Sequence, residues 1–347
     1  MTNPFTLNFG SEPGEYVSRH FQSQEILDSF LAEPSPSQVY MITGVRGAGK
    51  TVFLTEIEDH FRNEDDWIVF DLSIETDLLN SFASKLYNEK GLRSLIIKAN
   101  LNLSHFGFGV EISSKEPPIT DLGTAIEEML TIVAKHRRKV LISIDEAANS
   151  VSMRQFASEF QILLRRKFPV YLLMTGLYEN IYDLQNVKTL TFLYRAPKIQ
   201  LTPLNAVAVA DSYKRIFSVS DEKSREMAAL TMGYPYAYQV TGYLCYNRGS
   251  CELDDQFLHT FDEYMSEYVY SKIWDEQAPT KKKILRAMAD TDSGIVTEIR
   301  QKVGMKTEAF SVYRSRLIRQ GIIVADGYGR LAFTLPRFRE FILNQIY

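Results

Sequence analysis

The sequence predicts an α/β fold in which a parallel sheet is followed by a helical lid and a C-terminal winged helix-turn-helix. Three observations predict this order. Short apolar runs of strand length recur up to residue 202, each separated from the next by enough chain for a helix. Helical periodicity replaces these runs after Pro203. The end of the chain then shows three short helical patterns followed by two strand patterns around an Asp-Gly turn.

The candidate strands of the sheet are nearly continuous apolar runs rather than alternating ones. Strands buried on both faces need apolar side chains at every position, and parallel sheets covered by helices contain strands of this kind. The candidate strands are residues 38–43, 67–73, 139–145, 170–175 and 198–202. Residues 1–203 are therefore predicted to form one α/β domain.

An insertion is predicted between the second and third candidate strands, at about residues 97–114. Apolar residues alternate with polar ones in two stretches there, which are Leu101 and Leu103, then Phe106, Phe108, Val110 and Ile112. Alternation with a period of two favours a β-hairpin. We expect this hairpin to cover an edge of the sheet. Contact with a partner or with DNA is the alternative.

Residues 204–276 are predicted to form the helical lid. Apolar residues recur at helical spacing in three stretches, 205–217, 222–232 and 252–274. The last stretch carries aromatic residues near that spacing, at Phe257, Phe261, Tyr264, Tyr268 and Trp274. An aromatic stripe on one helix face is typical of a core-facing side rather than of a cofactor site. We therefore expect these rings to pack the lid.

Residues 277–347 are predicted to form the winged helix-turn-helix. The helical patterns lie near residues 280–289, 296–303 and 307–320, and the two strand patterns lie within 321–336. This end of the chain is basic, with 13 Lys and Arg against 6 Asp and Glu, a net charge of +7. The rest of the chain has 26 Lys and Arg against 37 Asp and Glu, a net charge of −11. A basic module is therefore attached to an acidic body.

The composition of the 347 residues, 45% hydrophobic and 24% charged, is typical of a water-soluble globular protein. No apolar run approaches the length that crosses a bilayer, and the start shows no leader pattern, so the expected location is the cytoplasm, with no membrane partner. Cys245 and Cys251 do not form a C-x-x-C pair. They are expected to be packed or idle thiols rather than a disulfide framework.

The most specific motif is the segment Gly44–Thr51, which matches G-x-x-x-x-G-K-[ST]. It follows a candidate strand and opens a candidate helix, which is the context of a phosphate-binding loop (P-loop). Its glycines let backbone N–H groups turn inward, and the helix N-terminus adds a partial positive charge. Lys50 is expected to reach the β and γ phosphates of ATP, and the Thr51 hydroxyl to ligate Mg²⁺. The residues expected around ATP or ADP are Gly44, Arg46, Gly47, Ala48, Gly49, Lys50, Thr51 and Val52.

Two adjacent acids, Asp145 and Glu146, follow the third candidate strand, where the second half of a nucleotide site is expected. Asp145 can hold Mg²⁺ through its water shell, and Glu146 can polarise the attacking water, so the pair favours hydrolysis over binding alone. Two acids after a strand also occur as the N-terminal cap of a helix. Their position downstream of a P-loop favours the functional interpretation.

These motifs and the order of the elements resemble the AAA+ ATPases, and within them the archaeal-ATPase and origin-recognition-like group that shades into the STAND signalling NTPases. The resemblance covers nearly the whole chain. It implies a sensor at the end of the fourth strand, which would be Thr175 reading the γ phosphate. It also implies an arginine near the fifth strand, which would be Arg195 stabilising transition-state charge in its own or a neighbouring subunit.

The same resemblance implies contacts from the lid and from the start of the chain. Gly233 and Pro235 match the Gly-x-Pro element of the STAND group, at the start of a helix that approaches the nucleotide. Other AAA+ members place a sensor arginine there, so this departure points to slow turnover. Tyr16, Val17 and Arg19 lie in a segment similar to the one that packs on adenine in the group. A helix before the sheet would show the same spacing for packing alone.

The basic end of the chain offers groups for nucleic acid. In a winged helix the third helix enters the major groove and the wing touches the DNA backbone. The basic residues that could meet phosphates are Lys306, Arg314, Arg316, Arg319 and Arg330. Winged helices also dock on proteins or on neighbouring domains, and the sequence leaves this alternative open.

The predicted function is that of an AAA+ ATPase whose nucleotide state controls the C-terminal module. The output would be binding of double-stranded DNA, of protein partners, or self-assembly. The alternative is a nucleotide-loaded switch that scarcely hydrolyses ATP, whose winged helix docks on the lid or on protein.

Overall fold

The computed structural model describes residues 3–7, 14–99, 101–107 and 119–345 of the chain. The chain divides into two compact units. The sheet unit consists of His20–Thr43 and Lys50–Gln200, and the helical unit consists of Met1–Arg19, Gly44–Gly49 and Leu201–Tyr347. Within the described ranges, no helix is both long and apolar enough to cross a membrane.

The sheet unit is built on a five-stranded parallel sheet, which confirms the prediction from the apolar runs. The strand order is β2-β3-β4-β1-β5. The strands are β1 Val39–Thr43, β2 Trp67–Asp71, β3 Lys139–Ile144, β4 Val170–Gly176 and β5 Lys198–Gln200. Thr43 of β1 lies beside Gly176 of β4, and Ile144 of β3 lies beside Met174. The carboxyl ends of these three strands therefore share one edge of the sheet.

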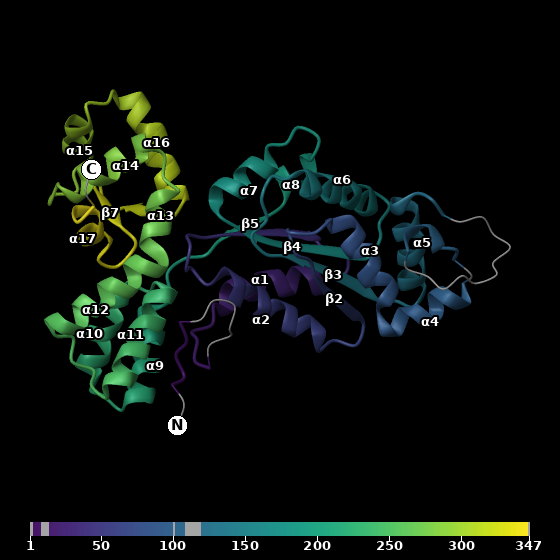
Figure 1. The fold of residues 1–347 in the computed structure, drawn as a ribbon, viewed down its shortest axis with the longest axis horizontal. Coiled ribbons are helices and arrows are strands. Elements are labelled where there is room, and N and C mark those ends of the chain that lie inside the picture. The colour runs from purple at the N-terminus through teal and green to yellow at the C-terminus, as the bar shows by residue number, and fades with distance from the viewer. Residues whose placement is uncertain (1–2, 8–13, 100, 108–118, 346–347) are drawn as a thin grey trace. The chain divides into compact units, whose positions relative to one another are not determined.

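Helices cover both faces of this sheet (Figure 1). On one face lie α1 His20–Leu31 and α2 Lys50–Arg62, where Phe30, Phe61 and Trp67 pack ring against ring. The other helices of the unit are α3 Leu78–Asn88, α4 Lys90–Lys98, α5 Leu122–Lys135, α6 Val151–Arg165, α7 Tyr178–Gln185 and α8 Thr191–Arg195. Among these, α3, α5 and α6 bury their apolar stripes in one common core with the strands.

The β-hairpin predicted at about residues 97–114 is wrong for the part of that range that the structure describes. Residues up to Lys98 complete α4, because Leu92 and Ile96 continue a helical stripe into the core. Ser104–Phe106 form a single 3₁₀ turn, and Leu103 is buried in the core of the sheet unit. Residues 100 and 108–114 lie outside the described ranges.

The helical unit contains the helices predicted for residues 204–276 and the elements predicted after them (Figure 1). The first are α9 Ala206–Phe217, α10 Asp221–Thr231, α11 Pro235–Arg248, α12 Asp255–Met265, the π-helical turn η2 Ser266–Tyr270 and α13 Ser271–Asp275. Then follow α14 Pro279–Ala289, α15 Val296–Val303, α16 Thr307–Arg319, β6 Ile323–Ala325, β7 Leu331–Phe333 and α17 Phe338–Leu343. β6 and β7 pair antiparallel, and Ile295 forms a bridge to Arg330 beside them.

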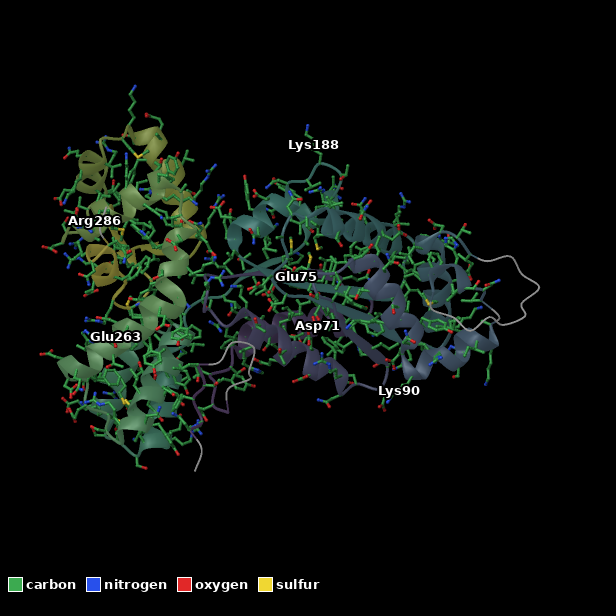
Figure 2. All side chains as sticks on the ribbon, viewed as in Figure 1. Asp71, Glu75, Lys90, Lys188, Glu263 and Arg286 are labelled. Carbon is green, nitrogen blue, oxygen red and sulfur yellow. The ribbon has the colours of Figure 1, made fainter. Side chains whose placement is uncertain are left out.

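One hydrophobic core runs through the helical unit and crosses the boundary predicted at residue 276. Tyr270 of η2 contacts Phe338 and Phe341 of α17, with ring centroids 4.9 and 5.5 Å apart, and its hydroxyl donates to the Pro336 carbonyl oxygen. Arg286 of α14 (Figure 2) donates to carbonyl oxygens at the end of α17. The predicted lid and C-terminal module thus share a core, and the boundary between them stays a prediction.

The aromatic stripe predicted for residues 257–274 is confirmed at Phe257, Phe261 and Trp274, which are buried, and is wrong at Tyr268, which is 54% exposed. The fifth residue, Tyr264, is half-buried against the core. The cause is the π turn at η2, which takes one more residue than an α-helical turn and rotates the residues that follow. Val269 and Tyr270 of η2 therefore take the inward positions.

The start of the chain packs on α11 within the helical unit. Phe5 is buried, its ring is stacked on that of Phe217 with centroids 5.8 Å apart, and the Thr6 N–H donates to the Gln239 side chain. At the contact α11 carries Gly242, where a Cβ would lie 2.4 Å from the Phe5 ring. The glycine is therefore what lets Phe5 approach the helix.

Candidate functional site

The loop between β1 and α2 has the backbone that its glycines allow. Gly47 and Gly49 have φ of +74° and +78°, in the left-handed region where side chains are strained. Between them, the Ala48 N–H donates to the Val45 carbonyl oxygen at 3.1 Å. Successive N–H groups in such a turn form an anion-binding concavity. The segment Gly44–Gly49 belongs to the helical unit.

Tyr234 packs against this loop. The residue is 4% exposed, and its hydroxyl donates to the main-chain oxygen of Arg46. A Cβ on Gly47 would lie 2.1 Å from the Tyr234 hydroxyl oxygen, so only glycine fits there. Burial raises the pKa of Tyr234, which keeps the hydroxyl protonated and able to donate.

Two groups that the resemblance placed near the nucleotide lie beside Gly49. A Cβ at Gly49 would be 3.7 Å from Pro235 Cβ and 3.5 Å from Arg19 Nη1. Pro235 is the first residue of α11, and the turn before it has Gly233 with φ of +71°. Arg19 Nη2 donates to the Thr202 carbonyl oxygen at 2.9 Å. Contact of these groups with a nucleotide stays a prediction.

The Arg46 side chain is engaged by the helical unit. Its Nη2 pairs with Glu276 Oε1 at 2.9 Å, and both side chains are 30% exposed. Glu276 lies between α13 and α14. Arg46 was expected to border the nucleotide, and this stays a prediction; its guanidinium has a carboxylate partner within the protein.

In the sheet unit, Thr51 meets the acid that follows β3. Lys50 and Thr51 open α2, where Lys50 is buried and Thr51 and the next residue, Val52, are half-buried. The Thr51 hydroxyl donates to Asp145 Oδ2 at 2.6 Å. The fold thus brings a hydroxyl and a carboxylate that are 94 residues apart in the sequence to one edge of the sheet.

Asp145 also accepts a hydrogen bond from the neighbouring strand. Thr175, fully buried in β4, donates its hydroxyl to Asp145 Oδ1. The loop after β3 can pass this close because β4 ends in Gly176, where a Cβ would lie 2.9 Å from the Ala147 carbonyl oxygen. The Thr175 hydroxyl is thus engaged with the carboxylate, and its expected role as a sensor of the γ phosphate stays a prediction.

Glu146 has a backbone conformation that is uncommon for its residue type. Its φ is +54°, and the residue is exposed. Hydrogen bonds hold this turn: the Glu146 N–H donates to Asp145 Oδ1 at 2.9 Å and to Thr175 Oγ1 at 3.4 Å, and the Ala147 N–H donates to the Thr175 carbonyl oxygen at 2.7 Å. Such conformations persist only where the surroundings enforce them, and they cluster at active sites.

The remaining predicted residues lie at the surface or are half-buried. Tyr16 is 39% exposed, and Val17 packs half-buried against the core of the helical unit. Arg195 is the last residue of α8, shortly before β5, and is exposed. Lys306, just before α16, and Arg330, just before β7, are also exposed. Their roles stay predictions.

The arginines predicted for DNA binding on α16 do not share one face of the helix. With about 100° between successive residues, Arg316 and Arg319 fall on the exposed side together with Glu308 and Val312. Arg314 is half-buried on the flank of the helix. The exposed face of α16 is thus mixed in character rather than uniformly basic.

Two residues at the loop were not singled out by the sequence. Tyr234 lies between Gly233 and Pro235, which the sequence did single out, so its position in the Gly-x-Pro element was an available signal. Glu276 carries no local signal, because its partner Arg46 lies 230 residues away in the chain.

Comparisons with known proteins find solved structures that are similar to this one. The structure is similar to that of the Aeropyrum pernix ORC2 protein, solved as ADPNP-ADP complexes, with a TM-score of 0.56, 13% identity, and coverage of 97% of this chain and 96% of that one. The chain therefore has the same fold as the ORC2 protein. Lower scores, of 0.46 and 0.44, are found for CDC6P from Pyrobaculum aerophilum (12% identity, coverage 97% and 95%) and for AMPPCP-bound DnaA from Aquifex aeolicus (12%, 88% and 90%).

Comparisons by sequence cover less of the chain. Residues 267–342 match a family model described as a domain of unknown function (DUF8462). The match begins in η2 and ends in α17, so it takes the π turn together with the C-terminal elements. No curated protein matches the chain.

Proposed function

We propose that the chain binds ATP with Mg²⁺ and hydrolyses it. The observation that carries this proposal is the 2.6 Å hydrogen bond between the Thr51 hydroxyl and Asp145. A hydroxyl directly after Gly-Lys and a carboxylate after a nearby strand are the protein groups that P-loop ATPases offer to Mg²⁺. The ORC2 protein, which has the same fold, was solved with ADPNP and ADP, and this supports a nucleotide as the ligand.

The donor set at this position fits Mg²⁺. This ion prefers oxygen ligands, keeps several waters, and is usually held by one or two protein groups together with phosphate oxygens. Thr51 and Asp145 supply one hydroxyl and one carboxylate oxygen that already lie 2.6 Å apart. When bound, Mg²⁺ would neutralise charge on the β and γ phosphate oxygens.

The other groups have roles that follow from their positions. Lys50, at the N-terminus of α2, would bind the β and γ phosphates together with the loop N–H groups. Glu146, exposed next to Asp145, would orient and polarise the attacking water. Thr175 would hold the Asp145 carboxylate, and Arg195 would act on the nucleotide of its own or a neighbouring subunit.

Steady-state phosphate release tests this proposal. Glu146→Gln should lower the rate on the order of 100-fold and retain ADP binding, because it removes the base and keeps the shape. Glu64→Gln, an exposed glutamate after α2, is the matched control. If wild type binds ADP but releases no more phosphate than Glu146→Gln, the non-hydrolysing switch replaces the ATPase. If Lys50→Ala binds ADP as tightly as wild type, the loop is not the phosphate site.

We also propose that the elements from α14 to β7 form a winged helix-turn-helix that binds double-stranded DNA. Three helices followed by an antiparallel hairpin, with Ile295 bridging to the hairpin, support this assignment. The exposed side of α16 carries Arg316 and Arg319, and Tyr328 at the turn of the hairpin is fully exposed. An exposed helix face beside an exposed hairpin tip is the surface such modules use.

The salt dependence of duplex binding tests this second proposal. Replacing Arg316 and Arg319 with Gln should weaken binding. The slope of log affinity against log salt is negative, and it should become less steep by about 0.9 for each lost phosphate contact. Arg225→Gln with Lys272→Gln, two exposed cations of the same unit, is the control pair. An unchanged slope would place the contact elsewhere. Absence of duplex binding at any salt concentration would favour docking on protein.

A further inference from the structure

The loop Gly44–Gly49 is attached to the rest of the helical unit at two points. The Tyr234 hydroxyl donates to the Arg46 carbonyl oxygen, and the Arg46 guanidinium pairs with Glu276 at 2.9 Å. In an anion-binding loop the N–H groups point inward, and the carbonyl oxygens point away from the ligand. A hydrogen bond to a carbonyl oxygen therefore holds the loop without competing for phosphate.

The first attachment is rigid. Tyr234 is 4% exposed, and its ring lies so close to the loop that a Cβ on Gly47 would be 2.9 Å from the ring carbon bearing the hydroxyl. The turn that precedes it is fixed because the Thr231 side-chain oxygen accepts the Gly233 N–H at 3.1 Å. Any shift of the start of α11 would therefore move the loop.

The second attachment compensates a partly buried charge. Arg46 Nε is buried and has no hydrogen-bond partner among the described residues, so this guanidinium depends on Glu276 for its ion pair. Glu276 stands between the end of α13 and the start of α14. This pair connects the loop to the point where the lid helices pass into the C-terminal elements.

We propose that Tyr234 and Glu276 position the phosphate-binding loop and couple its conformation to α11 and to the α13–α14 junction. The inference rests on the proposed nucleotide binding by this loop. Ligand binding needs the loop N–H groups turned inward, which left-handed glycines permit. Tyr234 and Glu276 attach to the loop in a conformation where Gly47 and Gly49 are both left-handed. Nucleotide binding and order at the α13–α14 junction therefore favour each other.

The two attachments differ in expected weight. A buried hydrogen bond between a hydroxyl and a carbonyl contributes about tenfold to an equilibrium constant. An ion pair with both side chains partly exposed contributes about fivefold at most. Tyr234→Phe should therefore weaken ADP binding about tenfold, and Glu276→Gln should weaken it less.

The experiment combines the affinity for a fluorescent ADP analogue with hydrogen exchange of residues 271–289, with and without ADP. The variants are Tyr234→Phe, Glu276→Gln and the double variant. The control for Tyr234 is Tyr213→Phe, because the Tyr213 hydroxyl is also buried in the helical unit and donates to a carbonyl oxygen, that of Tyr238, at 2.7 Å. Asp275→Asn, an exposed acid next to Glu276, is the control for the ion pair.

We expect ADP to slow hydrogen exchange across residues 271–289 in wild type and in both controls. In the double variant, ADP should no longer slow it. Tyr213→Phe should lower Tm about as much as Tyr234→Phe while leaving ADP affinity unchanged. Wild-type ADP binding together with unchanged affinity and exchange in the double variant would overturn this inference alone. Absence of ADP binding in wild type would overturn the proposed function and this inference with it.

Discussion

Asp145 accepts three hydrogen bonds, and their donors come from separate segments of the sheet unit. Thr51 donates from α2, Thr175 donates from β4, and the Glu146 N–H donates from the loop after β3. Three hydrogen bonds from separate segments fix the rotamer of the carboxylate. The position of the carboxylate therefore depends on three segments of the sheet unit and not on the loop after β3 alone.

Thr175→Val tests whether this support matters for catalysis. Val keeps the volume of Thr175 but removes the hydroxyl that donates to Asp145, and loss of such a supporting bond costs about 10- to 100-fold in activity. We expect steady-state phosphate release to fall by that factor, with a much smaller change in ADP affinity. Thr131→Val, which removes a hydroxyl that donates to the Glu127 carbonyl oxygen of its own helix, is the control. Equal losses in both variants would contradict a positioning role.

Glu58 links the stability of the sheet unit to pH. It lies on α2 and is 5% exposed, and burial raises its pKa above the ordinary 4.5, partly opposed by hydrogen bonds from Ser143 and Arg62. The folded protein therefore binds the proton more tightly than the unfolded chain, so this contribution to stability is complete below pH 4.5 and is lost as the pH rises through the folded pKa.

Thermal unfolding from pH 4 to 8 would measure this effect. Glu58→Gln should remove the part of the fall in Tm that occurs as the pH rises above the ordinary pKa of a glutamate. Asp59→Asn, which removes a half-exposed acid that also pairs with Arg62, should leave that fall in place. A pH profile of Glu58→Gln that parallels wild type would show that Glu58 is not the group responsible.

At the scale of single residues, the sequence predicted the groups that belong to short, recognisable motifs. Gly47, Gly49 and Thr51 follow from one loop pattern, and Asp145 follows from an acid placed after an apolar run. Tyr234 lies inside the Gly-x-Pro element, which gave a signal for its position but not for its contact with the loop, and Glu276 had no local signal. Their contacts with the loop depend on how α11 and α13 pack, and packing across 188 and 230 residues leaves no local pattern.

At the scale of elements, the π turn η2 decides which face of a long helical segment is buried. Met265, just before the turn, and Tyr270, the last residue of the turn, both face the core, although they are five residues apart. In a regular α-helix this spacing would turn one of them toward solvent. The extra residue of the turn corrects the mismatch.

Deletion of Tyr268 should convert this segment to a regular α-helix while keeping Tyr270 in the core, since it removes the one residue that the π turn accommodates. We expect the variant to fold, with a loss of stability within about 2 kcal/mol. Deletion of the exposed His259 in α12 should instead rotate the whole stripe outward and prevent folding. Circular dichroism and thermal melts of both variants provide the measurement, and equal damage would contradict this role for η2.

Because Phe5 contacts Gly242, Gly242→Ala should change the stability of this protein in the opposite direction from its effect on a free helix. In a free helix, Gly242→Ala would stabilise by about 1 kcal/mol through helix propensity. In this protein the new Cβ would lie 2.4 Å from the Phe5 ring, so we expect net destabilisation of about 1–3 kcal/mol. In a Phe5→Ala background the same change should become neutral or stabilising. A cycle of urea melts measures the coupling, and additive effects would contradict the contact.

The sequence predicted the strands to within two or three residues, because continuous apolarity distinguishes a buried parallel strand. It failed in the described part of residues 97–114, where the alternation of Leu101 and Leu103 with polar residues imitated a strand. Helical burial of Leu92 and Ile96, together with burial of Leu103, decided that region instead. It also failed at Tyr268, because no residue type signals a π turn.

At the scale of the whole molecule, each compact unit contains one of the two tryptophans of the chain. Trp67 of β2 is 4% exposed and Trp274 of α13 is 6% exposed, so each reports on the core of its own unit. Trp67→Phe and Trp274→Phe therefore separate the unfolding of the two units by fluorescence.

We expect the lid helices and the C-terminal elements to unfold together, since one core contains both. In Trp67→Phe, the urea midpoint from Trp274 fluorescence should agree within about 0.3 M with the loss of hydrogen-exchange protection in α9–α11 and in α14–α16. The urea midpoint of the sheet unit, measured from Trp67 fluorescence in Trp274→Phe, need not equal that of the helical unit. Earlier loss of protection in α14–α16 alone would show that residues 277–347 fold independently.

The contact of Tyr270 with Phe338 and Phe341 also determines where the chain can be cut. A fragment that starts at residue 277 would lack Tyr270 and leave these two rings without their cover, inviting aggregation. A fragment for isolated binding studies should begin at or before Ser266, so that the π turn travels with α17. The family match that starts at residue 267 places its own limit at nearly the same position.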